Sequence, residues 1–179
     1  VDFQELLVLS GYQDGVLQVW DFNEAADDGG GCRGNLTGHD GPINTVHADF
    51  NEQLAVSGCE DGSLRIWDLE EMLCLRRLEA YAATSAVWVL QGNLSGPRDA
   101  WWALSGSFSE PLHIWDLKGM RCAQQLDGST GVSAMGADCK GHMLVIGRYT
   151  GDLCIWDLRT RACLGTMQGH SGVVRAVCA

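Results

Sequence analysis

The chain has 179 residues, of which 46% are hydrophobic and 20% are charged, a composition typical of a folded domain rather than a disordered chain. Twelve basic residues against 23 acidic ones give a net charge of −11. This charge argues against a nucleic-acid binder and against docking on anionic membranes, because both depend on Lys and Arg. Residues 1–80 carry 16 acidic and 4 basic residues, whereas residues 81–179 carry 7 and 8. We therefore expect one acidic side, suited to protein partners with basic surfaces.

The N-terminal residues are not typical of a secretion leader or a membrane anchor. The chain starts with Val1 and carries Asp2 and Glu5 without a preceding basic region. No apolar run approaches the roughly 18 residues of a membrane-spanning helix. We expect no transmembrane helix, and a chain that begins inside a larger protein.

An internal repeat organises the sequence. The dipeptide Trp-Asp occurs four times, at intervals of 47, 48 and 41 residues, and a nearly fixed period of this size indicates a repeat architecture. Each dipeptide ends a short alternating apolar stretch typical of a β-strand; these stretches are residues 16–20, 64–67, 112–115 and 153–156. A further strand is expected before each of them, at residues 6–10, 54–57, 103–105 and 143–146. Asp14-Gly15 and Asp61-Gly62 between such strands predict tight hairpins. No segment has a sustained helical period, so the prediction is an all-β chain.

A second motif recurs with the first. Residues 36–39 read Leu-Thr-Gly-His before the second Trp-Asp, and residues 167–170 read Met-Gln-Gly-His after the fourth. A Gly-His followed by a Trp-Asp resembles the WD-repeat (WD40) family of β-propellers, in which each repeat forms one four-stranded blade. The resemblance covers essentially the whole chain and implies a non-enzymatic scaffold for protein–protein interactions. It divides the chain into repeats at about 1–38 (lacking the first strand), 39–80, 81–128 and 129–169, with the start of a further repeat at 170–179.

These repeats supply about four blades. A closed propeller of about seven blades would need roughly 300 residues, so we expect a partial propeller, a fragment of a larger one. The alternative is a small closed ring, in which a strand at residues 173–177 pairs with the strand at residues 6–10.

The resemblance also implies a buried structural tetrad in each blade. In the family the Asp accepts a hydrogen bond from the His, the His contacts a Ser, and the Ser contacts the Trp indole. The second repeat has all four residues: His39, Ser57, Asp61 and Trp67. The first repeat supplies Ser10, Asp14 and Trp20. The third has Tyr81 and Ser109 in place of His and Asp, which leaves Ser105 and Trp115; the fourth keeps only Trp156. We expect apolar packing to hold these last two blades.

The remaining reactive side chains are assigned no chemistry. Three cysteines at repeat-equivalent positions, Cys74, Cys122 and Cys163, lie on separate blades, too far apart for disulfides. Free thiols predict the cytoplasm or the nucleus. The histidines show no zinc spacing, so neither a metal nor a cofactor is expected, and His47 and His113 are predicted at the surface. Residues 29–34 are glycine-rich without a phosphate-loop Lys, and are predicted to form a flexible loop.

The sequence favours binding over catalysis. Most acids follow a Trp or occupy turns, so no enzyme is expected; the alternatives are a substrate-receptor subunit of a ubiquitin ligase and, more remotely, a propeller-based hydrolase or lyase. In the family, partners bind the face that carries the turn between the second and third strands. On this face we place Gln13, Pro42, Asn44, Glu60, Phe108, Tyr149 and Arg175.

Two aromatic pairs carry the contact hypotheses. Phe108 and Tyr149 are predicted to share one surface patch and to anchor a partner, although they would serve equally to cover the third and fourth blades. Trp101 and Trp102, adjacent residues of a strand, should point to opposite sides, and they mark a possible second contact site on the other face.

Overall fold

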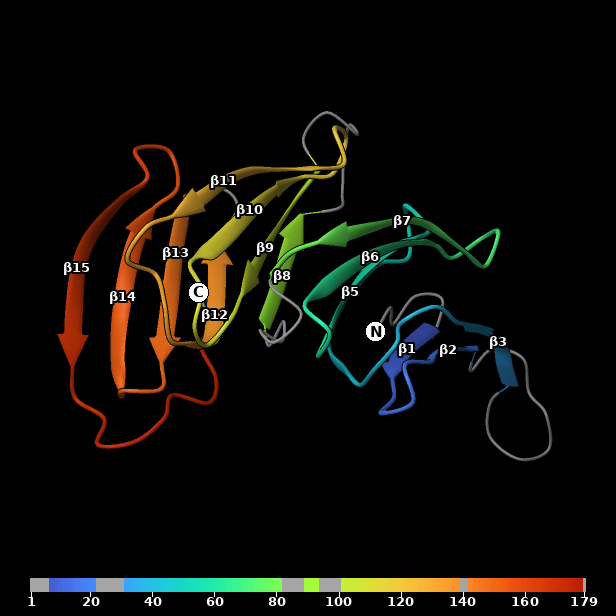
Figure 1. Cartoon of the computed structure of the whole chain (residues 1–179), viewed down its shortest axis with the longest axis horizontal. Helices are drawn as coiled ribbons and strands as arrows, with labels where there is room; N and C mark the ends of the chain where they lie inside the picture. The colour runs from blue at the N-terminus through green and yellow to red at the C-terminus, as the bar shows by residue number, and fades with distance from the viewer. Residues whose placement is uncertain (1–6, 22–30, 82–88, 94–100, 139–141, 179) are drawn as a thin grey trace.

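The computed structural model describes residues 7–21, 31–81, 89–93, 101–138 and 142–178, and all its regular elements are antiparallel strands (Figure 1). Sheet 1 contains β1 (Leu7–Gly11), β2 (Leu17–Asp21) and β3 (Gly31–Leu36). Sheet 2 contains β4 (Ile43–Asp49), β5 (Leu54–Cys59), β6 (Ser63–Asp68) and β7 (Leu73–Glu79). Sheet 3 contains β8 (Val89–Asn93), β9 (Trp102–Gly106), β10 (Leu112–Asp116) and β11 (Arg121–Leu126). Sheet 4 contains β12 (Val132–Asp138), β13 (Met143–Arg148), β14 (Asp152–Asp157) and β15 (Ala162–Gln168).

The all-β prediction is confirmed, and each sheet is formed by one continuous part of the chain. The described residues include no helix that is both long and apolar enough to cross a membrane. The predicted hairpin at Asp61-Gly62 joins β5 to β6: Gly62 has a φ of 83°, and Asp61 Oδ1 accepts a hydrogen bond from the Ser63 amide at 2.9 Å. Glycine suits this turn because a positive φ costs it little.

In sheets 2, 3 and 4 the Asp of the Trp-Asp dipeptide shapes the next turn. Asp68 Oδ1 accepts the amides of Glu70 and Glu71 at 2.9 and 2.8 Å, which reverses the chain from β6 into β7. Asp157 does the same for the amides of Arg159 and Thr160, at 2.8 and 3.2 Å. The dipeptide therefore couples a core aromatic to the turn that follows its strand.

Each tryptophan of the four Trp-Asp dipeptides lies beside a β-bulge, and a cysteine on the next strand is its cross-strand partner. The pairs are Trp20 with Cys32, Trp67 with Cys74, Trp115 with Cys122 and Trp156 with Cys163. The sequence revealed three of these positions. Cys32 was missed because the acidic, glycine-rich insertion ahead of it lengthens the spacing from its Trp.

The hydrophobic core lies between neighbouring sheets rather than inside any one of them. One cluster joins sheets 1 and 2 and includes Val19 and Trp67; a second joins sheets 2 and 3 and includes Ile66 and Trp115. A third joins sheets 3 and 4 around Trp156. Because each sheet completes its neighbour's core, the stability of one sheet depends on the next.

The four sheets form an open arc, with sheet 1 and sheet 4 at opposite sides of the view (Figure 1). The closed four-blade ring is therefore wrong. The strand predicted at residues 173–177 is also wrong, because this segment does not join a sheet. It lies against sheet 4, where the Val174 amide donates to Arg148 O at 3.2 Å and Ser133 Oγ donates to Val174 O at 2.7 Å.

The flexible loop predicted at residues 29–34 lies only partly within the described residues, because residues 29 and 30 fall outside them. Residues 31–34 are not a loop, however, but part of β3, because their backbone pairs with β2 through partners such as Val19 and Gly34.

A close contact repeats between successive sheets. A Cβ added to Gly106 would lie 2.7 Å from Cγ1 of Val132, the first residue of β12. Gly11 makes the equivalent approach to Ile43, and Gly147 makes it to Val174. Val174 thus occupies the place of a next blade's first strand, although it forms none.

Gly106→Ala is expected to destabilise the chain by about 1–3 kcal/mol, because the new methyl group must push sheets 3 and 4 apart. Gly165→Ala is the matched control, since a Cβ there meets nothing within 4 Å; its effect should stay within about 0.5 kcal/mol. Urea denaturation of both variants checks this, and equal midpoints would contradict the assigned contact.

Candidate functional site

The most extensive buried polar network lies in sheet 2. His39 precedes β4, Ser57 lies on β5 and Trp67 on β6, and these three side chains are 6%, 0% and 0% exposed. His39 Nε2 is 2.6 Å from Ser57 Oγ, and the Trp67 indole N–H donates to the same oxygen at 2.8 Å. Three residues of the predicted tetrad therefore form one hydrogen-bonded chain, as buried polar groups require.

Asp61, the fourth tetrad residue, does not contact His39 directly. Its Oδ1 accepts from Ser63 Oγ at 2.6 Å, and this hydroxyl oxygen lies 3.3 Å from His39 Nδ1. The implied Asp–His bond is thus corrected to a bridge through Ser63. Since the Ser63 hydroxyl gives its single proton to Asp61, His39 Nδ1–H donates to Ser63, and His39 Nε2 accepts from Ser57. The hydrogen bonds therefore all run in one direction, from the Trp67 indole N–H through Ser57, His39 and Ser63 to Asp61.

Ser63 was not among the predicted residues. Its signal in the sequence is its position two residues after Asp61, where Ser and Asp side chains commonly bond across a tight turn. Asp61 Oδ2 has no hydrogen-bond partner among the described residues, but it lies 3.6 Å from the Arg77 guanidinium. Burial alone would raise the pKa of Asp61; hydrogen bonds from Ser63 outweigh it, and the pKa lies below its ordinary value.

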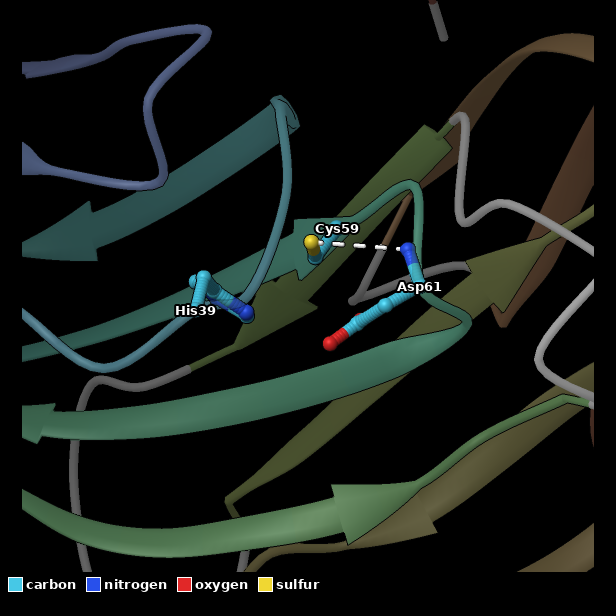
Figure 2. Close-up of side chains that lie close together, drawn as sticks. All are labelled: His39, Cys59 and Asp61. Atoms are coloured by element: carbon cyan, nitrogen blue, oxygen red, sulfur yellow. Dashed lines mark hydrogen bonds between the residues drawn. The ribbon is translucent and has the colours of Figure 1, made fainter.

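Figure 2 shows the side chains of His39, Cys59 and Asp61 lying close together, with ligand-type atoms within 4.8 Å of one another. Their donor types would suit zinc. Each group nevertheless has another role: the Cys59 thiol donates to Gly41 O at 3.3 Å and accepts the Asp61 amide at 3.5 Å. Burial raises the pKa of Cys59 to about 11, so this thiol is protonated near neutral pH. We interpret the cluster as part of the polar network.

The residue types of this network are those of a Ser-His-Asp hydrolase triad, but its geometry prevents that chemistry. Ser57 is completely buried, and its oxygen already accepts the Trp67 N–H, so no substrate reaches it. Burial, together with the Arg65 guanidinium, lowers the pKa of His39 to about 4. The arrangement holds strands together rather than activating a nucleophile.

Sheet 3 replaces the imidazole with a phenol. The Tyr81 hydroxyl donates to Ser105 O at 2.6 Å and lies 3.0 Å from Ser105 Oγ, which accepts the Trp115 indole N–H at 2.9 Å. The expectation that only apolar packing holds this sheet is therefore wrong. The reason is the length of the side chain: the tyrosine hydroxyl reaches Ser105, the counterpart in sheet 3 of the Ser57 that His39 contacts in sheet 2.

His113 is buried, not at the surface as predicted. It is 5% exposed and stacks on Tyr81 with ring centroids 4.5 Å apart. Neither ring nitrogen has a hydrogen-bond partner among the described residues. Burial lowers the pKa of His113 below its ordinary value, which favours the neutral ring. The alternation of residues in β10 predicted which side chains share a face with His113. It did not predict that the rings of Tyr81 and Trp115 cover this face.

Sheets 1 and 4 keep less of the network. In sheet 1 the Trp20 indole donates to Ser10 Oγ at 2.9 Å, and exposed Asp14 accepts the Val16 amide at 3.1 Å within its turn. In sheet 4 the Trp156 indole N–H is buried without a hydrogen-bond partner among the described residues. Ile146, where sheet 2 has Ser57, offers no acceptor, so this Trp is held by packing alone.

The predicted partner face carries an aromatic pair. The rings of Phe108 and Tyr149 meet edge to face with centroids 4.9 Å apart, and Phe108 is 56% exposed while Tyr149 is half-buried. Gly131 links their backbones: its amide donates to Phe108 O at 2.8 Å, and its carbonyl accepts the Tyr149 amide at 3.0 Å. The two rings thus form one patch, named here the aromatic patch, across the boundary of sheets 3 and 4.

The other residues predicted on this face are less uniform. Gln13, Glu60 and Arg175 are exposed, whereas Pro42 and Asn44 are half-buried. The Glu60 amide donates to Pro42 O at 2.9 Å, which places these two side by side. Asn44 Nδ2 has no hydrogen-bond partner among the described residues.

Trp101 and Trp102 face opposite neighbours, as their adjacent positions predicted. Trp101 packs in the cluster between sheets 2 and 3, and Trp102 packs against the cluster between sheets 3 and 4. Trp101 is 7% exposed and Trp102 is half-buried.

Trp67→Ala should destabilise the chain more than Trp156→Ala. Both variants lose about 3–5 kcal/mol of unfolding free energy from aromatic packing. Trp67→Ala also leaves buried Ser57 Oγ without the indole N–H that it accepts, at a further cost of about 1 kcal/mol. The phenylalanine variants isolate the hydrogen bond, because Trp156→Phe removes an N–H that has no partner. Denaturant melts measure all four; an equal loss for Trp67→Phe and Trp156→Phe would count against the network's contribution.

The free energy of unfolding should fall as the pH is lowered from about 6.5 to about 4, the ordinary and folded-state pKa values of His39. Between these values the unfolded chain binds the proton more readily, and the loss from this histidine is about 3 kcal/mol. His113 acts in the same direction, so His39→Gln is the comparison. Urea titrations across this range should show a shallower slope for the variant, and parallel slopes would refute the assignment.

Comparison with known proteins adds two findings. The family model described as "WD domain, G-beta repeat" matches residues 30–68, and no curated protein matches the chain. The crystal structure of the computationally designed Ika8 protein is similar to this chain with a TM-score of 0.78 and 24% sequence identity. The similarity covers 98% of this chain and 50% of the Ika8 chain, so the present chain spans half of that structure. Residues 30–68 therefore match a WD40 repeat, and the chain as a whole has the fold of a partial, open β-propeller.

Proposed function

We propose that this chain is a non-enzymatic protein-interaction scaffold, and that a protein partner binds the face bearing the aromatic patch of Phe108 and Tyr149. The WD40 repeat supports the scaffold role, because domains of this kind typically bind other proteins. The observation that carries the choice of face is the exposed, edge-to-face ring pair at the boundary of sheets 3 and 4.

The aromatic patch has the properties of an interface anchor. Phe108 leaves more than half of its surface in water, which a large apolar side chain does only at an energetic cost that a partner removes. The hydrogen bonds through Gly131 fix both backbones before a partner arrives, so little conformational entropy is lost on binding. Rings of this kind dominate the energetics of protein interfaces.

The charge of the same face selects the partner. Exposed Glu60 lies at the equivalent turn of sheet 2, in the part of the chain with 16 acidic and 4 basic residues. A partner with a basic rim therefore fits, and association should slow as the salt concentration rises. Exposed free thiols at Cys32, Cys122 and Cys163 fit a reducing compartment, the cytoplasm or the nucleus.

The double variant Phe108→Ala/Tyr149→Ala is expected to weaken partner binding by about 2 kcal/mol, roughly 30-fold, while the thermal melt stays nearly unchanged. Partners recovered with the intact chain and identified by mass spectrometry would be measured individually by titration against both proteins.

The matched control is Leu164→Ala/Met167→Ala, which removes two apolar side chains that are 58% and 50% exposed on β15. This control should bind as the unmodified chain does. Full affinity of the aromatic double variant for every recovered partner would exclude the aromatic patch as the binding site.

A further inference from the structure

A groove separates sheets 2 and 3 at the opposite ends of the strands from the aromatic patch. It encloses about 130 Å³, near the volume of a cavity that holds one benzene ring. The turns that follow β4 and β6 form one wall, and residues of the hydrophobic cluster between sheets 2 and 3 form the other. The lining residues that matter here are Glu52, Gln53, Asp68, Glu70, Leu75 and Trp101.

The apolar part of this groove suits a hydrocarbon chain. Leu75 is 43% exposed, and Trp101 and Met120 form the wall on the side of sheet 3. An aliphatic stem placed there would cover Leu75 from water, which is favourable in proportion to the area removed.

The polar part of the groove offers acceptors without charged donors. Glu52, Asp68 and Glu70 contribute carboxylates, and none of the described residues that line the groove is Lys, Arg or His. Gln53 adds an amide whose orientation is fixed, because its Nε2 donates to Phe50 O at 2.6 Å. Gln53 Oε1 is buried and has no hydrogen-bond partner among the described residues. Such a set complements a cation with several N–H groups.

The equivalent groove between sheets 3 and 4 lacks this chemistry. It is lined by Trp102, Leu104, Ile114, His142 and Leu158, with no carboxylate among these described residues. The backbone supports the equivalence, because the Leu117 amide donates to Trp101 O at 3.2 Å beside the first groove and the Leu158 amide donates to His142 O at 2.8 Å beside the second. Among the described residues, the acceptor-rich lining is thus found between sheets 2 and 3 and not between sheets 3 and 4.

We propose that the groove between sheets 2 and 3 binds an arginine side chain of an extended segment of a protein partner. The aliphatic stem lies along Leu75 and Met120, and the guanidinium reaches the carboxylates of Glu52, Asp68 and Glu70. A planar guanidinium fits better than a lysine ammonium, because its donors are spread over several directions and it is more weakly hydrated. This site lies on the other face from the aromatic patch and is independent of it.

The experiment titrates the 179-residue chain with a short, capped Ala/Gly peptide that carries one central arginine. The readout is the NMR signal of the Trp101 indole, assigned with Trp101→Phe. Replacing the arginine by citrulline, a neutral group of the same shape, should weaken binding about tenfold. Glu52→Gln/Glu70→Gln should weaken binding of the arginine peptide by a similar factor, because it removes two of the carboxylates that line the groove. Both side chains are exposed, so the variant should keep the fold.

The control Glu71→Gln/Asp127→Asn removes the same number of charges from exposed positions outside the groove and should bind as the unmodified chain does. Phe108→Ala/Tyr149→Ala should also bind the peptide normally, which separates this site from the one proposed above. Equal affinity for the citrulline or lysine peptide would overturn the proposal. Self-association that the Glu52/Glu70 variant abolishes would overturn it as well, because a second copy of the chain would then be the occupant.

Discussion

The structure depends on packing each sheet against the next through a buried tryptophan. Trp67 is 0% exposed, it fills the core between sheets 1 and 2, and its N–H bonds Ser57 on the neighbouring strand. One residue thus joins two strands of its own sheet by a hydrogen bond and two sheets by apolar contact. An isolated sheet of this kind exposes its apolar faces, so the arc is stable only as a series.

The way this tryptophan is satisfied changes along the chain. In sheet 2 an imidazole, a serine and a bridged carboxylate complete the network, and in sheet 3 a tyrosine hydroxyl takes the imidazole's place. In sheet 4 the indole N–H has no partner among the described residues. The same backbone register persists, because the bulge beside each Trp and the turn formed by its Asp are kept. Apolar packing and turn chemistry therefore maintain the blade when the polar chain is lost.

The two ends of the strands present different surfaces. One carries the aromatic patch, held rigidly through Gly131, and the other carries a groove whose polar lining consists of acceptors. Both arise where neighbouring sheets meet, since side chains from two repeats converge there. In a repeat architecture, both proposed binding sites therefore lie at boundaries between repeats. Substitutions in the turns would change the side chains at these sites without changing the strands.

The sequence by itself determined the strands, the hairpins and the repeat, because the alternation of apolar residues and the Trp-Asp and Asp-Gly dipeptides act locally. The resemblance to WD repeats also implied that Ser57 and Trp67 are partners, and the structure shows their hydrogen bond. Only the tertiary structure decided that Tyr81 replaces a histidine, that Ser63 bridges Asp61 to His39, and that His113 is buried. It alone brought Gln53 and Trp101 together across two sheets and left the arc open. These outcomes depend on side-chain reach and on contacts between repeats, which local patterns do not encode.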